Sequence, residues 1–155
     1  MTPGRLSALA GARGGATAVE FALVAPLFLA LVFGTTEFGR LLWIEQALQE
    51  TAIAGARCVA IAQSPTSNPT SSPCASGGSY SPASATTYIQ KVASGWGLSL
   101  PTSNIFLYPE GNSSGCTGLS QVTLTSTFTS VVPSLVQLGG GITLSASACY
   151  PNINS

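Results

Sequence analysis

The feature that most limits the fold of this chain is an apolar run near its N-terminus. Residues 16–36 read ATAVEFALVAPLFLALVFGTT and carry a single charge, Glu20. A helix of this length covers about 30 Å, the thickness of the hydrocarbon layer of a bilayer. The alternative, a buried core helix, would need a large body around it, and the rest of the chain is small and polar. The run therefore predicts one membrane-spanning helix.

The apolar run leads directly into an amphipathic segment, residues 37–62. Its apolar side chains recur at spacings of three and four, with polar residues between them. The recurring positions are Phe38, Leu41, Leu42, Ile44, Leu48, Ala52, Ala56 and Val59. We therefore expect one long helix over 16–62, apolar all round in its first half and amphipathic in its second.

A second, shorter helix is predicted after a Pro-rich loop. Three prolines interrupt residues 64–81, a low-complexity stretch that predicts a loop. Ser81 followed by Pro82 is typical of an N-cap and a first helical residue. We expect this helix to end near Gly95 or Gly97. The apolar side chains at helical spacing within it are Ala85, Ile89, Val92 and Trp96.

The last third of the chain has the pattern of β-strands. Segments 104–108, 121–130 and 142–150 are β-branched, aromatic or alternating. In the second, even positions from Val122 to Phe128 share one face and threonines occupy the other, the pattern of a sheet packed on one side only. The expected fold is therefore α+β, with the long helix packed on a small antiparallel sheet and the second short helix beside them.

Four cysteines indicate disulfides in an oxidising compartment. They are Cys58, Cys74, Cys116 and Cys149. An even number in a small region rich in Ser, Thr, Gly and Pro is typical of a disulfide framework, whereas a zinc site is disfavoured because the chain has no C-x-x-C pair and no His. All three connectivities are open. A short loop favours Cys58–Cys74, and antiparallel pairing of the last two strands would favour Cys116–Cys149.

The charges and the missing residue types argue against nucleic-acid binding and catalysis. Five basic and five acidic residues cancel, so no field draws the chain to nucleic acid. Without any His, no Ser–His or Cys–His pair can form, and without any Asp, carboxylate chemistry is left to five Glu. Lys91, the one lysine, is expected to be a solvated charge. We expect no enzyme, no cofactor and no metal.

The orientation of the predicted span follows from its flanks. Arg5 and Arg13 precede the apolar run, and the positive-inside rule keeps them in the cytoplasm. Arg40 and Arg57 follow it, so the charge count alone is weak. The cysteines, which belong on the oxidising side, place the C-terminal part outside the cytoplasm.

The junction before the apolar run resembles the processing site of type IV pilin-like precursors. A short basic leader ends in Gly14-Gly15, and an apolar helix follows with Glu20 as its fifth residue and Phe21 next. The resemblance implies that a membrane-embedded prepilin peptidase cuts between Gly15 and Ala16 and that the helix is then kept. A secretory signal peptide would instead lose its apolar part.

Residues 18–40 (AVEFALVAPLFLALVFGTTEFGR) resemble the TadE-like family, pseudopilins or minor pilins of the tight adherence (Tad) type IV pilus. The Glu20-Phe21 pair, Pro26 and the exit Glu37-Phe38-Gly39-Arg40 carry the likeness, which covers about residues 14–60. It implies a pilin-like fold and a role in biogenesis of an adhesive pilus, with the bilayer, a prepilin peptidase, other pilin subunits and the assembly machinery as partners.

The resemblance also implies a domain plan and a location. A cytoplasmic leader occupies 1–15, the TadE-like helix 16–62 (transmembrane 16–36, amphipathic 37–62), and a disulfide-stabilised periplasmic or extracellular domain 63–155. The chain would be a single-pass protein of the bacterial inner membrane, or part of the extracellular pilus.

Three of the helix residues, Glu20, Phe21 and Pro26, have implied roles in assembly. Glu20 would meet the new amino group of Ala16, in its own subunit or in a neighbour, because a carboxylate within a bilayer needs a partner; the alternative is a hydrated residue near the interface. Pro26 would bend the helix, since it removes a backbone N–H and clashes with the carbonyl of Ala22. The alternative function is a stand-alone anchored envelope protein or adhesin that never enters a pilus.

Overall fold

The computed structural model describes residues 14–64, 72–110, 116–130 and 141–152 of the 155. The chain divides into two compact units, Met1–Gly39 and Arg40–Ser155. The expected leader falls mostly on residues 1–13, outside the described part, as do Pro65 and Pro69 of the expected loop.

One long helix, α1 (Gly14–Gln63), contributes to both units, which confirms the expected continuous helix over 16–62. It runs through Pro26 without a break. Near the end of the apolar run, Thr35 donates a hydrogen bond to the carbonyl of Leu31 (3.0 Å) and Thr36 donates to that of Val32 (2.8 Å). These hydroxyls are thus satisfied within the helix and add little polarity to its surface.

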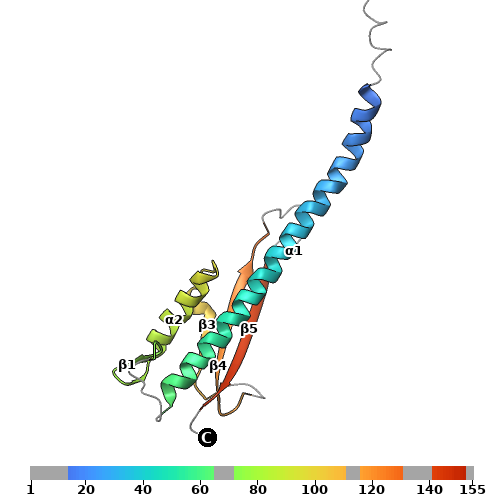
Figure 1. The fold of residues 1–155 in the computed structure, drawn as a ribbon. Helices are drawn as coiled ribbons and strands as arrows, with labels where there is room; N and C mark the ends of the chain where they lie inside the picture. The colour runs from blue at the N-terminus through green and yellow to red at the C-terminus, as the bar shows by residue number, and fades with distance from the viewer. Residues whose placement is uncertain (1–13, 65–71, 111–115, 131–140, 153–155) are drawn as a thin grey trace, which may run out of the picture. The chain divides into compact units, whose positions relative to one another are not determined.

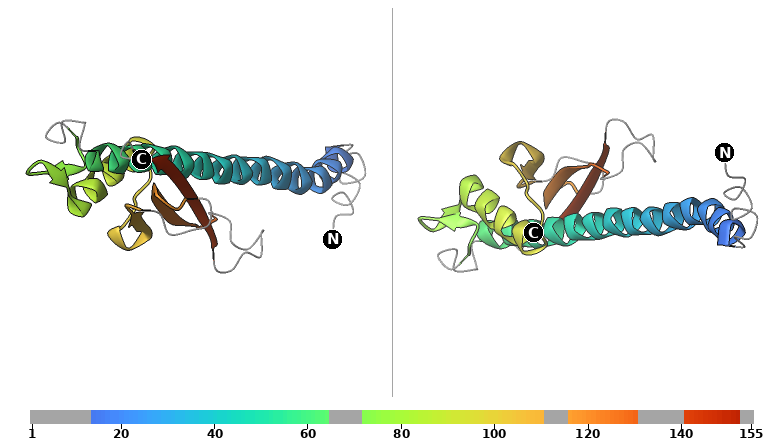
Figure 2. Two further views of the ribbon diagram at one scale, coloured as in Figure 1. Left: turned by 90° about the horizontal axis from the view of Figure 1, so that it is seen from below. Right: turned by 90° about the horizontal axis from the view of Figure 1, so that it is seen from above.

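The second unit is α+β, as expected. Its sheet has the order β3 (Ile105–Tyr108), β4 (Leu119–Phe128), β5 (Ile142–Pro151), with both pairings antiparallel. Figures 1 and 2 agree that this sheet and α2 (Pro82–Gly95) lie against the C-terminal part of α1.

The register of β4 confirms the predicted inward face. Val122, Leu124 and Phe128 are buried, while Thr127 on the other face is exposed. β4 pairs with β5 along its whole length, from Leu119↔Pro151 to Phe128↔Ile142. The strand begins two residues before the predicted Gln121 and ends two before the predicted Ser130.

Helix α2 begins as predicted but turns a different face inward. The Ser81 hydroxyl accepts a hydrogen bond from the backbone N–H of Ser84, and Pro82 is the first helical residue. The buried positions are Ala85, Ile89 and Ala93. Val92 is half-buried, and Trp96 follows the helix and is 39% exposed, so the buried face departs from the apolar spacing of the sequence after Ile89. Small alanines at a spacing of four let α2 approach its neighbours closely.

Part of the predicted loop over 64–81 is a small hairpin. Strands β1 (Ala75–Ser76) and β2 (Ser79–Tyr80) pair antiparallel around Gly77 and Gly78, whose φ angles are 61° and 82°. Two successive positive φ angles are what a tight two-residue hairpin turn requires, and glycine adopts them without strain. The loop prediction was wrong for residues 75–80 because Gly77-Gly78 was not recognised as a turn signal.

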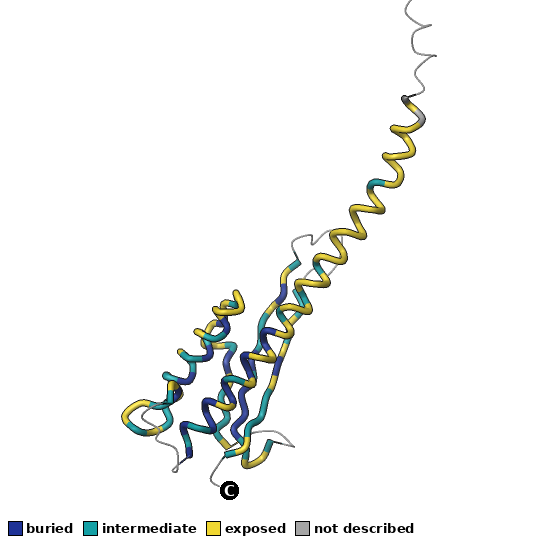
Figure 3. Tube along the Cα trace, in the orientation of Figure 1, coloured by how far each residue is buried: buried dark blue, intermediate teal, exposed yellow. Residues whose placement is uncertain are grey.

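The hydrophobic core lies where α1, α2 and β4 meet. Figure 3 shows the buried residues on the C-terminal part of α1 and on the segments beside it. The α1 residues of the cluster are mostly small, and they include Leu48, Ala52, Ala56, Val59 and Ala62. Thr51 is also buried, and its hydroxyl donates to the Ala47 carbonyl at 2.7 Å.

Two disulfides join elements of this unit. Cys58 of α1 bonds Cys74, and Cys116 bonds Cys149 of β5, each with Cα atoms 5.8 Å apart. This is the pairing that loop length and antiparallel strands favoured. Cys149 lies opposite Gln121 in the β4–β5 register, so the second bridge links β5 to the chain just before β4.

Candidate membrane anchor and assembly helix

The N-terminal part of α1 presents an apolar surface that nothing in its own unit covers. Every Val, Leu and Phe from Val19 to Phe33 is exposed, between 37% for Val32 and 75% for Leu23. Burying one such side chain is worth about 1.5–3 kcal/mol. Ten of them on one helix surface therefore require a lipid or protein environment that this chain does not supply.

Within the described residues, α1 is the one helix long and apolar enough to cross a membrane. None of its most apolar window is buried, so this window is not part of the hydrophobic core, to which only the later part of α1 contributes. The coarse prediction of a membrane-associated N-terminal helix is supported in this way.

Gly15 and Ala16 lie in the first turn of α1, which begins at Gly14. Glycine inside a helix costs roughly 1 kcal/mol relative to alanine, so the Gly14-Gly15 turn is the weakest of the helix. A peptidase that needs an unwound substrate would find the lowest opening cost at this turn. Cleavage there stays a prediction.

Glu20 and Phe21 lie one turn farther along α1. Both are exposed, Phe21 by 74%. Glu20 is one helical turn from Ala16, so the amino group that cleavage would create lies within reach of its carboxylate in the same helix. The chain itself places no other charged residue within its apolar run.

Pro26 is exposed within α1. It supplies no backbone N–H to the carbonyl of Ala22, and a neighbouring helix or a local adjustment must compensate for this inside a membrane. The bend predicted at Pro26 and its role in assembly stay predictions. The structure brings the cysteines together in pairs, whereas the predicted assembly residues share one helix.

Sequence reasoning missed an aromatic cluster at one end of the second unit. The rings of Trp43 and Trp96 meet edge to face with centroids 5.7 Å apart. The Arg40 guanidinium lies over the Phe128 ring, 5.4 Å from its centroid. The pairing was invisible because Trp96 reaches Trp43 only through the fold. Trp43 could have been singled out from the sequence, because it follows shortly after the apolar run and tryptophans are enriched at membrane interfaces.

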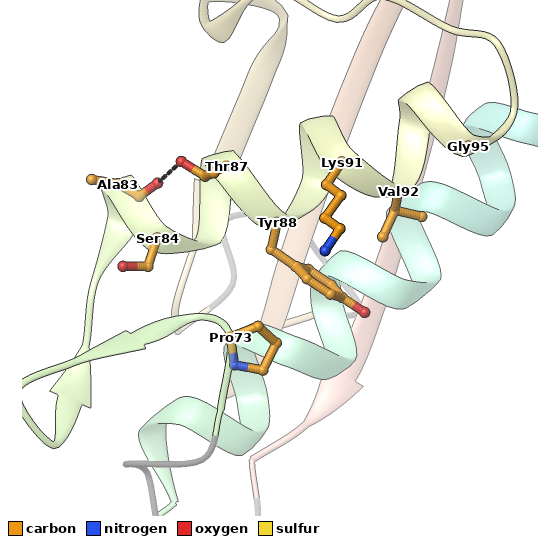
Figure 4. Close-up of a pocket in the computed structure, with 8 residues that line it drawn as sticks. All are labelled: Pro73, Ala83, Ser84, Thr87, Tyr88, Lys91, Val92 and Gly95. Atoms are coloured by element: carbon orange, nitrogen blue, oxygen red, sulfur yellow. Dashed lines mark hydrogen bonds between the residues drawn. The ribbon is translucent and has the colours of Figure 1, made fainter.

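An open groove of about 690 Å³ lies along α2 (Figure 4). Tyr88 and Lys91 line it with Pro73 and small residues of the helix, and Lys91 is exposed, as predicted. The described lining residues include no carboxylate and no cysteine. Among the described residues no cluster of His, Cys, Asp or Glu could hold a metal ion.

The tyrosine at the end of β2 carries a buried polar atom. The Tyr80 hydroxyl has no hydrogen-bond partner among the described residues. Burial raises the pKa of Tyr80, because the phenolate would lose its hydration. A lone phenol with a raised pKa is less suited to catalysis at neutral pH than an ordinary one.

A known protein family matches the N-terminal helix of this chain. The family model described as TadE-like protein matches residues 15–57. No curated protein and no solved structure matches the chain. The matched segment runs from Gly15 in the first turn of α1 to Arg57, the residue before the first disulfide cysteine. The resemblance inferred from Glu20, Pro26 and the helix exit is thereby confirmed for residues 15–57, the segment that is similar to TadE-like proteins.

Proposed function

We propose that this chain is a minor pilin or pseudopilin that acts in the biogenesis of a Tad-type adhesive pilus. The observation that carries the proposal is the TadE-like segment 15–57, whose apolar run 16–36 is uncovered and holds one carboxylate, Glu20. A helix of this kind needs neighbours in the membrane or in a fibre. Residues 40–63 of the same helix are instead packed in a disulfide-bonded unit.

In the proposed sequence of events, the precursor inserts into the bacterial inner membrane. Its leader stays in the cytoplasm, and its C-terminal unit lies in the periplasm. A prepilin peptidase then cuts after Gly15. The carboxylate of Glu20 pairs with the Ala16 amino group of its own or a neighbouring subunit, and this pairing lowers the cost of bringing two helices together in the apolar phase. The C-terminal unit primes, regulates or caps the fibre without catalysing a reaction.

The role of Glu20 is tested by substitution. Glu20→Ala removes a charge whose insertion costs about 2.5–3.5 kcal/mol, so membrane insertion is retained or improved. The same change removes the partner of the Ala16 amine, and we expect pilus formation and adherence to fall at least tenfold. Membrane fractionation and a count of sheared pili measure the two effects on the same cultures.

Glu45→Ala is the matched control, because Glu45 is an exposed glutamate of α1 beyond the apolar run. It should leave both readouts unchanged. Normal pilus formation in the Glu20→Ala strain would contradict the proposal and leave the stand-alone anchored envelope protein as the better account.

A further inference from the structure

One end of the second unit carries an exposed aromatic cluster beside the start of its helix. We define the entry face as Arg40, Trp43, Ile44, Trp96, Gly97 and Leu98, the residues that line a shallow pocket of about 250 Å³. Trp43 is 57% exposed and Trp96 39%, although their rings touch each other. Two tryptophans that contact each other and still face solvent are unusual on a domain with so small a core.

The position of the entry face along the chain indicates what covers it. Trp43 is seven positions after Thr36, the last residue of the apolar run, which is about 10 Å along a helix. The interfacial layer of a bilayer extends about 5–8 Å beyond its hydrocarbon core. Side chains of a helix lean toward its N-terminus, so the indole of Trp43 reaches back toward that layer.

The chemistry of the face fits the same environment. Indole rings are apolar with one N–H donor, and tryptophans concentrate at the boundary between headgroups and acyl chains. Arg40 supplies a guanidinium that can pair with lipid phosphate, and the residues lining the pocket include no carboxylate. A protein partner would not by itself explain why the face lies directly after the span.

We propose that the entry face rests in the headgroup layer of the membrane that α1 spans, so that Trp96 and Leu98 of the folded unit contact lipid in addition to Trp43. The unit would then be held against the bilayer at two points far apart in the sequence. This inference rests on the membrane anchor of the proposed function, and it does not depend on entry into a pilus.

The chain contains two tryptophans, so its intrinsic fluorescence reports on this face alone. The full chain is reconstituted in vesicles of phosphatidylcholine and phosphatidylglycerol, and Trp43→Phe and Trp96→Phe variants isolate each indole. Quenching is compared between lipids brominated near the headgroup end of the acyl chain, lipids brominated near the bilayer midplane, and aqueous iodide. A control chain without either native tryptophan carries Phe106→Trp, at an exposed position on β3.

We expect the shallow brominated lipid to quench most of the emission of Trp96, as it does that of Trp43, with weak quenching by iodide. The control tryptophan at position 106 should show the reverse. Trp43 quenched by lipid while Trp96 responds to iodide alone would overturn the inference and leave the anchor intact. Neither indole responding to lipid would overturn both. Shielding of Trp96 from iodide that grows with protein density, without lipid quenching, would assign the face to a second copy of the chain and also overturn the inference.

Discussion

Gly55 lies where α1 packs closely against α2 and β4. A Cβ at this position would lie 3.0 Å from Cγ1 and Cδ1 of Ile89 and 3.4 Å from Cγ1 of Val122. Glycine in the middle of a helix costs about 0.5–1 kcal/mol relative to alanine. Its presence is therefore explained by packing, since a larger side chain would push α2 and β4 away from α1.

Replacing this glycine by a bulky residue should weaken the second unit. Gly55→Val is expected to lower the free energy of unfolding by about 1–3 kcal/mol through overpacking. Gly95→Val is the control, because a Cβ there meets nothing within 4 Å. Denaturant unfolding of the full chain in detergent micelles, followed by circular dichroism, measures both. Equal midpoints for the two variants would contradict this account of the helix contact.

Removing the hydroxyl of Tyr80 should stabilise the folded second unit. Its buried hydroxyl has no partner among the described residues, and an unsatisfied buried group costs about 1–3 kcal/mol. Tyr80→Phe should therefore raise the free energy of unfolding by about 1 kcal/mol, whereas Tyr88→Phe, on the wall of the open groove, should change it less. Loss of stability in Tyr80→Phe would show that the hydroxyl has a partner in the folded chain.

The same tyrosine makes a prediction for alkaline pH. Burial raises the folded-state pKa of Tyr80 above its unfolded value. The contribution of the neutral Tyr80 phenol to the free energy of unfolding is therefore fully present below the unfolded-state pKa of about 10. This contribution is lost as the pH rises through the folded-state pKa. The wild type should lose more stability than Tyr80→Phe in this range, measured by unfolding at successive pH values. If the stability of the wild type and that of Tyr80→Phe fell in parallel with rising pH, this prediction would be contradicted.

At the scale of elements, the end of α1 is fastened to the sheet by side-chain hydrogen bonds. The Gln63 amide donates to Ser120 Oγ at 2.8 Å and to the Pro109 carbonyl at 3.3 Å. Ser120 is buried and also bonds Asn152 beyond β5. One glutamine thus connects the last turn of α1 to segments from both sides of β4.

Removing that amide should loosen the helix from the sheet. Gln63→Ala is expected to lower the free energy of unfolding by about 0.5–1.5 kcal/mol, because the hydrogen bonds from the amide are lost while Ser120 and Pro109 keep their other partners. Gln46→Ala is the control: the Gln46 amide bonds only its i+4 neighbour Glu50 at 3.1 Å on an exposed surface, a contact worth about 0.2–0.5 kcal/mol. Hydrogen exchange at the C-terminal end of α1 should also rise in Gln63→Ala and not in the control.

The elements predicted well from sequence are those whose signal is local and repeated. The apolar run and the alternation from Val122 to Phe128 each follow one period over many residues, and both predictions were confirmed. The inward face of α2 follows the apolar spacing of the sequence only as far as Ile89. The sequence marks Val92 and Trp96 as more apolar than Ala93, but the closeness of the packing favours the small residue.

At the scale of the whole molecule, contacts between distant residues could be predicted from the sequence only where local secondary structure determines them. The Cys116–Cys149 bridge could be expected because antiparallel pairing of two predicted strands brings their opposite ends together. The contact of Trp43 with Trp96 could not, since it depends on how α2 packs on α1. The leader site was found through a family motif, and its processing is a reaction that no fold displays.

The central claim is tested most directly by the intact mass of the chain, recovered from bacterial membranes without reducing agent. This one mass reports both leader cleavage and disulfide formation. The account predicts a mature protein that begins at Ala16 and lacks four hydrogens, one pair for each of the bonds Cys58–Cys74 and Cys116–Cys149. A chain that still begins at Met1, or one that has lost the whole apolar helix, would contradict processing as a pilin. A mass with four free thiols would contradict the placement of the C-terminal unit on the oxidising side.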